Sequence, residues 1–211
     1  MLAVIVLFDR FTALDAVGPY EVLSSLPGTE VVFAAQEPGP VANEKGTLRL
    51  IADAALADVS HADVVVVPGG PGQHARMTDK SLLDWLRAAD SSTAWTTSVC
   101  TGSLLLGAAG LLKGRRATTH WLAMDQLAGL GAVPTRGRVV TDGKYMTAAG
   151  VSAGLDMTLT LAGTLAGDAA AQSVQLAIEY DPQPPYQAGS PATAPQAIAD
   201  ALRARRASIL T

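Results

Sequence analysis

Short apolar runs rich in β-branched residues alternate along the chain with longer segments in which apolar residues recur at helical spacing. The runs predict strands at Leu2–Phe8, Val31–Ala35, Thr47–Ile51, Val64–Val67, Ala94–Val99, Arg138–Thr141 and Tyr145–Ala148. The longer segments predict helices at Ala16–Ser25, Ser81–Asp90, Gly102–Ala109, Leu122–Ala128, Ala153–Ala166 and Ala169–Ile178. This alternation is typical of a mostly parallel sheet with helices on both faces, so we expect a doubly wound α/β sandwich. Asp142-Gly143, between the last two strands, predicts a hairpin turn.

Five prolines between Asp181 and Pro195 interrupt this alternation. Proline neither donates to a β-ladder nor continues a helix, so we expect an irregular segment there. It separates residues 1–180, which we expect to form one flavodoxin-like α/β domain, from residues 181–211. The last part of that tail, Gln196–Ala207, is predicted to be a helix packed on or near the domain. Three arginines near the end of the tail suit the negative end of a helix dipole, which favours a solvated helix over a binding patch. They are Arg203, Arg205 and Arg206.

Composition narrows the class of protein. A chain of 211 residues with 49% apolar side chains can bury a core without disulfides or structural metals. The net charge of −4 and the scattered basic residues argue against a nucleic-acid partner. Cys100 is the only cysteine, which favours the cytoplasm. The apolar run Met1–Phe8 is too short to cross a membrane and has no basic leader, so we expect no membrane association.

A glycine-rich turn follows the most apolar strand. Val64–Val67 leads into Pro68-Gly69-Gly70-Pro71-Gly72, at the carboxyl end of a strand, where open parallel sheets bind their ligands. Two adjacent glycines can turn their amide N–H groups toward a ligand. No Lys-Ser or Lys-Thr follows, so the pattern favours an anion or oxyanion site over a phosphate loop. A tight turn without any ligand is the alternative.

Cys100 lies where a predicted strand runs directly into a predicted helix. Most lone cysteines are small buried hydrophobes. At the positive end of a helix, however, the thiolate is favoured and the pKa of the thiol falls. The free N–H groups of the first helical turn can also stabilise negative charge. We therefore interpret Cys100 as a nucleophile with a lowered pKa.

The proton partner of Cys100 has more than one candidate. Asp15 follows the first predicted strand, although an Asp before a helix is often an N-cap. Glu21 lies further into that helix and is the weaker candidate. His120 could instead form a Cys-His pair. Three widely spaced histidines and one cysteine give no zinc pattern, so we expect neither a metal nor a cofactor.

A second motif, Gly150-Val151-Ser152-Ala153-Gly154, matches the G-x-S-x-G elbow of α/β-hydrolases. In those enzymes the catalytic histidine follows the serine along the chain, whereas His61, His74 and His120 all precede Ser152. We therefore expect Ser152 to cap the following helix and the two glycines to allow close packing.

Four segments in this order, residues 15–23, 62–72, 99–102 and 148–156, resemble the ThiJ/PfpI family of the class I glutamine-amidotransferase-like superfamily. The likeness runs from about Leu2 to about Ile178. It implies a reactive Cys100 beside an acidic Asp15, and it assigns the backbone amides of Gly70 and Thr101 to an oxyanion site. It also implies a homodimer.

Within the family, the chain is most similar to the bacterial isonitrile hydratases, through Asp15, through Thr101 after the nucleophile and through Ala117-Thr118-Thr119-His120-Trp121. This likeness implies hydration of an organic isonitrile to an N-substituted formamide. Cys100 would attack, Asp15 would supply or relay the proton, Asp15 or Thr101 would position water, and His120 would lie at the substrate. Ala149 departs from the glycine that the family carries there.

Two other functions stay open. Regulators that carry this domain ahead of a helix-turn-helix suggest a module that senses a small molecule or a redox change, although only one short helix is predicted after the proline segment. Deglycase or glyoxalase-like stress proteins of the family are the other alternative.

Overall fold

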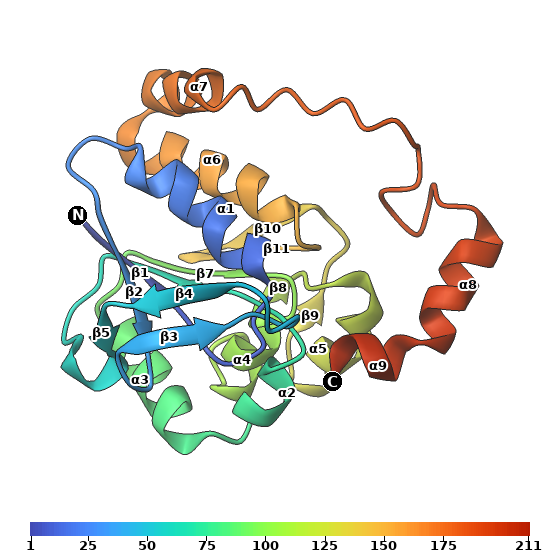
Figure 1. Ribbon diagram of the computed structural model, residues 1–211, viewed down its shortest axis with the longest axis horizontal. Coiled ribbons are helices and arrows are strands. Elements are labelled where there is room, and N and C mark those ends of the chain that lie inside the picture. The colour runs from blue at the N-terminus through green and yellow to red at the C-terminus, as the bar shows by residue number, and fades with distance from the viewer.

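A seven-stranded sheet runs through the middle of the molecule in the computed structural model, which describes residues 1–211 (Figure 1). The strand order is β10-β11-β7-β6-β1-β2-β5, and every neighbouring pair is parallel except β10 with β11. The strands are β1 (Leu2–Val6), β2 (Glu30–Ala35), β5 (Ala54–Ala55), β6 (Val64–Val67), β7 (Trp95–Val99), β10 (Val139–Asp142) and β11 (Tyr145–Ala148). The predicted doubly wound α/β fold and the hairpin at Asp142-Gly143 are confirmed.

Helices cover both faces of this sheet (Figure 1). One face carries α1 (Ala13–Ser24), α6 (Ala153–Ala166) and α7 (Asp168–Ala177), and the other carries α2 (Gln73–Arg76), α3 (Lys80–Asp90) and α4 (Gly102–Ala108). Because both faces are covered, β6 can be four consecutive valines, each at most 1% exposed. Burying one such side chain stabilises the fold by about 1.5–3 kcal/mol.

Close packing of α6 against β7 depends on Gly154. A Cβ atom at this position would lie 3.2 Å from both methyl groups of Val99, the residue before Cys100. The expectation that the glycines of the second motif allow close packing is therefore confirmed at Gly154. Ser152 does occupy the N-cap of α6, but its side chain makes no capping bond and accepts instead from Arg138 Nη2 at 3.2 Å.

Within residues 1–180, three elements differ most from their sequence predictions. Helix α1 begins at Ala13 rather than Ala16, so Asp15 lies inside the first turn and not at the cap. The predicted helix Leu122–Ala128 is a 3₁₀ turn, η2 (Trp121–Ala123), followed by α5 (Met124–Gly129). The predicted strand Thr47–Ile51 is β4 (Arg49–Ala52), which pairs antiparallel with β3 (Gly39–Ala42) in a hairpin outside the central sheet. The remaining elements are short: η1 (Leu56–Asp58), β8 (Arg116–Ala117) and β9 (Val133–Pro134).

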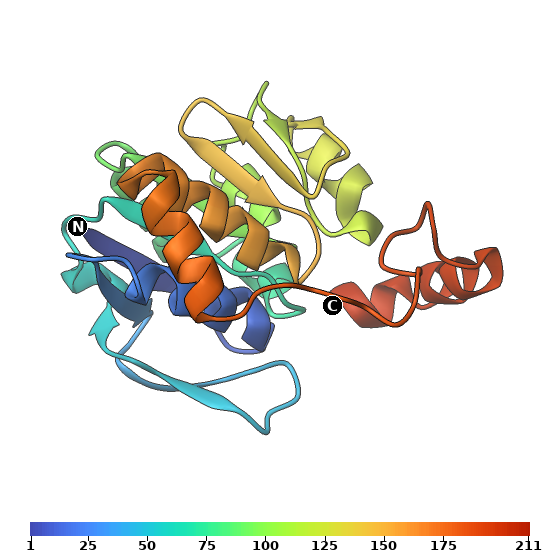
Figure 2. The same ribbon diagram turned by 90° about the horizontal axis from the view of Figure 1, so that it is seen from above.

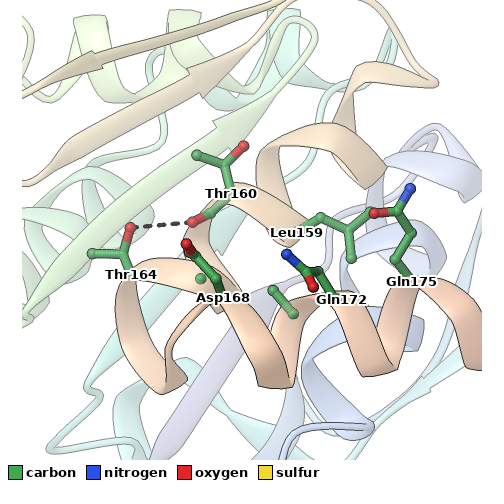
Figure 3. A pocket seen from close by; sticks show the side chains of 8 residues that line it. Leu159, Thr160, Thr164, Asp168, Gln172 and Gln175 are labelled. Carbon is green, nitrogen blue, oxygen red and sulfur yellow. Dashed lines mark hydrogen bonds between the residues drawn. The ribbon is translucent and has the colours of Figure 1, made fainter.

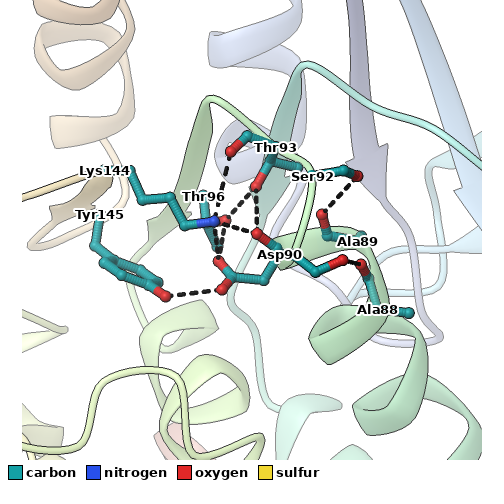
Figure 4. Close-up of polar contacts among 9 residues, drawn as sticks. Ala88, Ala89, Asp90, Ser92, Thr93, Thr96, Lys144 and Tyr145 are labelled. Atoms are coloured by element: carbon teal, nitrogen blue, oxygen red, sulfur yellow. Dashed lines mark hydrogen bonds and ion pairs between the residues drawn. The ribbon is translucent and has the colours of Figure 1, made fainter.

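Asp90, at the end of α3, joins the amino-terminal ends of β7 and β11 (Figure 4). Its carboxylate accepts from Thr96 Oγ1 at 2.6 Å and from Tyr145 Oη at 2.8 Å, and Lys144 Nζ lies 3.3 Å away. Burial, followed by the bond to Asp90, raises the pKa of Tyr145 to about 12. These contacts link the end of α3 to the amino-terminal ends of β7 and β11, at the edge of the sheet opposite Cys100.

The tail follows an irregular proline segment, as predicted. The single helix predicted at Gln196–Ala207 is instead two helices, α8 (Gln196–Ala204) and α9 (Arg206–Leu210), which are separated at Arg205. Figure 2 shows α8 standing away from the body of the molecule. The end of the tail returns to it, because Leu210 is buried and Arg206 pairs with Asp125 of α5. Arg203 lies over the ring of Trp121, 5.6 Å from its centroid.

Candidate active site

Cys100 occupies a sharp elbow between β7 and α4. Its backbone N–H donates to Ala148 O at 3.0 Å, which extends the pairing of β7 with β11 by one residue. Its φ of 57° then takes the chain into the left-handed region, where a non-glycine residue costs on the order of 1–3 kcal/mol. This strain is stored at the one thiol of the protein, which is 5% exposed.

Asp15 reaches the same place from the first turn of α1 and is completely buried. Its Oδ2 accepts the N–H of Gly69 at 2.9 Å, whereas Oδ1 has no hydrogen-bond partner. Burial raises the pKa of this carboxyl to about 8, against the opposing effect of the Gly69 bond and with a further rise from the charge of Glu44. Asp15 is therefore mostly protonated at neutral pH, so it can act as a proton donor.

The pKa of Cys100 is raised well above its usual value, so the predicted lowering is wrong. Burial is the largest cause and the nearby charge of Asp15 is the next, while the N–H and the hydroxyl of Thr101 act to lower it. The helix end alone suggested a thiolate, but the sequence did not reveal how completely water is excluded. The resting site is therefore a thiol beside a neutral acid, and the thiol must pass on its proton as it attacks.

Thr101 acts on the sulfur directly, whereas Gly70 contacts the hydroxyl of Thr101. The N–H of Gly70 donates to Thr101 Oγ1 at 3.0 Å, so in this arrangement it orients the threonine hydroxyl. The N–H of Thr101 donates to no oxygen and acts on the sulfur. Gly69 must lack a side chain, because a Cβ there would lie 2.5 Å from Thr101 N and 3.0 Å from Asp15 Oδ2.

His120 does not pair with Cys100. It forms the N-cap of η2, where Nδ1 accepts from the N–H of Leu122 at 3.4 Å, and burial lowers its pKa. His120 is therefore neutral at pH 7, with no bond to the sulfur. Glu21 lies on an exposed face of α1. Among the three candidate proton partners, the structure brings only Asp15 to the thiol.

Sequence reasoning missed several polar residues around this pair. Glu44, between β3 and β4, accepts from Thr12 Oγ1 at 2.7 Å, and its charge reaches Asp15. Ser103 and Thr119 bind the carbonyl oxygen of Cys100. Nothing in the sequence pattern marks Glu44. Ser103 follows the motif at residues 99–102, and Thr119 lies within the motif at residues 117–121. Their hydroxyl groups were the only sequence signal that they could bind a backbone carbonyl.

Two cavities lie away from Cys100 and Asp15. A polar groove of about 500 Å³ runs between α6 and α7 and is lined by residues that include Thr160, Asp168 and Gln172 (Figure 3). A second cavity of about 260 Å³ lies beyond the carboxyl ends of β1 and β2. Neither is lined by Cys100 or Asp15. The structure contains no cluster of three or more metal-ligating side chains, and none of its helices is both long and apolar enough to cross a membrane.

A cysteine at the elbow of a doubly wound sheet, with an acid from the first helix beside it, defines a class of protein. Similarity to known proteins identifies this class. The chain belongs to the DJ-1/PfpI family, whose model matches residues 1–164, and this confirms the resemblance to the ThiJ/PfpI proteins. It is 47% identical over 204 residues to the isonitrile hydratase of Pseudomonas putida, which covers 97% of this chain and 89% of that protein.

Two further relatives place the chain within the family. A ThiJ/PfpI family protein from Pseudomonas syringae has a crystal structure that superposes with a TM-score of 0.95 at 38% identity, over 99% of this chain and 87% of that one. The HTH-type transcriptional regulator CdhR of Pseudomonas aeruginosa is 34% identical over 69% of this chain, which corresponds to 41% of the regulator.

Proposed function

We propose that this protein hydrates an organic isonitrile to the N-substituted formamide, with Cys100 as nucleophile and Asp15 as proton donor. The 47% identity to an isonitrile hydratase over 97% of the chain bears out the activity predicted from the sequence. The residue roles rest on one observation: the single thiol of the protein lies beside a completely buried carboxyl, and burial raises the pKa of that carboxyl to about 8. A neutral acid can donate a proton to a carbon atom, which a carboxylate cannot do.

In the first step, the sulfur of Cys100 bonds to the terminal carbon of the isonitrile. That carbon also takes a proton from Asp15, and Asp15 receives the proton that the thiol loses. The product is a thioimidate, in which the former isonitrile carbon carries one hydrogen and is bound to sulfur. Because the carboxyl returns to its protonated form, no charge is left in a site that disfavours charge.

In the second step, water adds to the thioimidate carbon. The oxygen bonds to carbon, the nitrogen gains a proton, and the carbon–sulfur bond breaks as the carbonyl forms. The sulfur recovers its proton and the N-substituted formamide leaves. Asp15 or the hydroxyl of Thr101 would position the water, since Thr101 Oγ1 is itself oriented by the N–H of Gly70.

The burial of Cys100 suits this substrate. An isonitrile group is linear and only two atoms long, and its reactive carbon is terminal. Such a group can reach a thiol that is 5% exposed while the rest of the molecule remains outside. A carbonyl substrate, which must present a branched carbon, would need more room.

The test is turnover of a simple isonitrile, followed by mass spectrometry for a product heavier by one water. Cys100→Ala should give no product above the uncatalysed background, and Asp15→Asn should lower kcat by about 10²–10⁴-fold. Ser152→Ala, which alters the hydrolase-like motif, is the matched control and should turn over normally. If Cys100→Ala produced formamide at the wild-type rate, the proposed mechanism would be wrong.

Ligand sensing is the second candidate, because part of a transcriptional regulator is 34% identical to this chain. Tight binding of a metabolite without any product would favour it over hydration.

We also propose that the enzyme acts as a cytoplasmic homodimer. The family resemblance supports a dimer, and α7 and α8 leave Leu176 and Ile198 78% and 52% exposed, which a second copy could cover. The lone thiol, which cannot form an intrachain disulfide, supports the cytoplasm.

A further inference from the structure

The carbonyl oxygen of Cys100 is held by side chains alone. Thr119 Oγ1 donates to it at 2.9 Å and Ser103 Oγ donates at 3.2 Å, and both residues are at most 1% exposed. No backbone N–H donates to this oxygen, since the N–H of Leu104 bonds to the carbonyl of Thr101 instead. Two buried hydroxyl groups therefore donate to the backbone carbonyl of the nucleophilic residue.

This carbonyl belongs to the same rigid unit as the N–H of Thr101. A trans peptide is planar, so its oxygen and its N–H point in opposite directions and cannot turn independently. Fixing the oxygen of Cys100 therefore also fixes the direction of the Thr101 N–H. That N–H has no oxygen acceptor and interacts with the sulfur of Cys100.

The backbone at Cys100 is strained, so we expect this peptide to rotate if the hydrogen bonds to its oxygen are lost. Cys100 has a φ of 57°, which a non-glycine residue holds only when its surroundings enforce it. Ser103 is local, in the first turn of α4. Thr119 comes from the segment between β8 and η2, so its bond ties the elbow to a separate part of the chain.

We propose that Thr119, assisted by Ser103, is a positioning residue that locks the peptide between Cys100 and Thr101 and thereby aims the Thr101 N–H at the reacting sulfur. Thr119 touches neither substrate nor sulfur in this proposal and acts only through the peptide. Its effect on turnover rests on the proposed isonitrile hydration, whereas its effect on the thiol does not.

The test compares Thr119→Val, which loses the hydroxyl at nearly constant volume, with Thr119→Ser, which keeps it. Thr97→Val is the matched control, because Thr97 is equally buried and its hydroxyl donates to the carbonyl of Val65 at 3.0 Å, away from the elbow. The first readout is the pKa of Cys100, taken from thiolate ultraviolet absorbance as the difference from Cys100→Ala. The second is kcat and KM for the isonitrile.

Thr119→Val should raise the pKa of the thiol by about one pH unit and lower kcat about tenfold, with KM within about twofold, because one stabilising donor is misdirected. Thr119→Ser should restore the wild-type pKa of the thiol and the wild-type kcat. Thr97→Val should melt at a lower temperature but keep both values. An unchanged thiol pKa in a folded Thr119→Val would overturn the proposal, as would an equal change in Thr97→Val.

Two further results separate failure of this proposal from misfolding and from failure of the proposed function. If Thr119→Val does not fold, Ser103→Ala removes the other hydroxyl and should change the thiol pKa in the same direction; no change there would refute the lock. If the wild-type protein turns over no isonitrile, the proposed function fails, and the thiol titration still decides the role of Thr119.

Discussion

Replacing Asp15 by Asn should change how the stability of the protein depends on pH. Asp15 is completely buried, and its pKa rises from 3.8 in the unfolded chain to about 8 in the folded one. Between these two values the folded protein holds a proton that the unfolded chain releases. The unfolded state therefore binds fewer protons, and the free energy of unfolding falls as the pH rises through this window.

The size of the effect follows from the shift. Each pH unit inside the window removes about 1.4 kcal/mol of stability, so the wild type should lose about 3 kcal/mol between pH 5 and pH 7 from this carboxyl alone. The loss should level off above about pH 8, where the folded carboxyl also ionises. The amide introduced by Asp15→Asn has no acidic proton to lose, and its oxygen can still accept the N–H of Gly69, so the variant should lack this slope.

The assay is urea unfolding of both proteins at several pH values between 5 and 8, with the difference in unfolding free energy plotted against pH. Asp79→Asn is the control. Although burial acts to raise the pKa of Asp79, bonds from Ser81, Arg76 and Leu82 lower it overall. The same chemical change should therefore alter stability by a constant amount across this pH range.

The reasoning fails if the difference between wild type and Asp15→Asn does not vary with pH. That result would mean that Asp15 is ionised in the folded protein, and the proton donor of the proposed mechanism would be lost. A slope of the opposite sign would mean that the carboxylate is stabilised by partners that the structure does not contain.

Two further outcomes are expected. Gly69→Ala should destabilise the protein by about 1–3 kcal/mol in urea unfolding, because the new Cβ would lie 2.6 Å from Thr101 Oγ1, whereas Gly129→Ala, with open space around it, should not. Equal stability of the two variants would contradict the close approach at the site. Sedimentation equilibrium at micromolar concentration should give twice the chain mass, and a monomer there would refute the homodimer.

The sheet could be predicted from sequence because its signal is local. Val64–Val67 is apolar at every position, which is typical of a strand covered on both faces, and Asp142-Gly143 is itself a strong turn signal. The hairpin of β3 and β4 was not recognised as a unit outside the sheet, because Gly39-Pro40 is typical of a loop and strand pairing depends on distant partners.

The central pair of the candidate site could be predicted from sequence, but its other members and its electrostatics could not. Cys100 and Asp15 follow predicted strands, so their meeting at one edge of the sheet could be inferred. Their pKa values could not, because both depend on exclusion of water, and that of Asp15 also depends on Glu44, whose position is set by the β3–β4 hairpin. The same is true of the Thr119 bond to Cys100, which no spacing in the sequence indicates.

A thiol that keeps its proton has one more consequence. Peroxide attacks thiolates, and sulfur that senses oxidants is usually both ionised and open to solvent. Cys100 is neither, since its pKa is raised and it is 5% exposed. We therefore expect peroxide to react slowly with Cys100 while the thiol is protonated and buried.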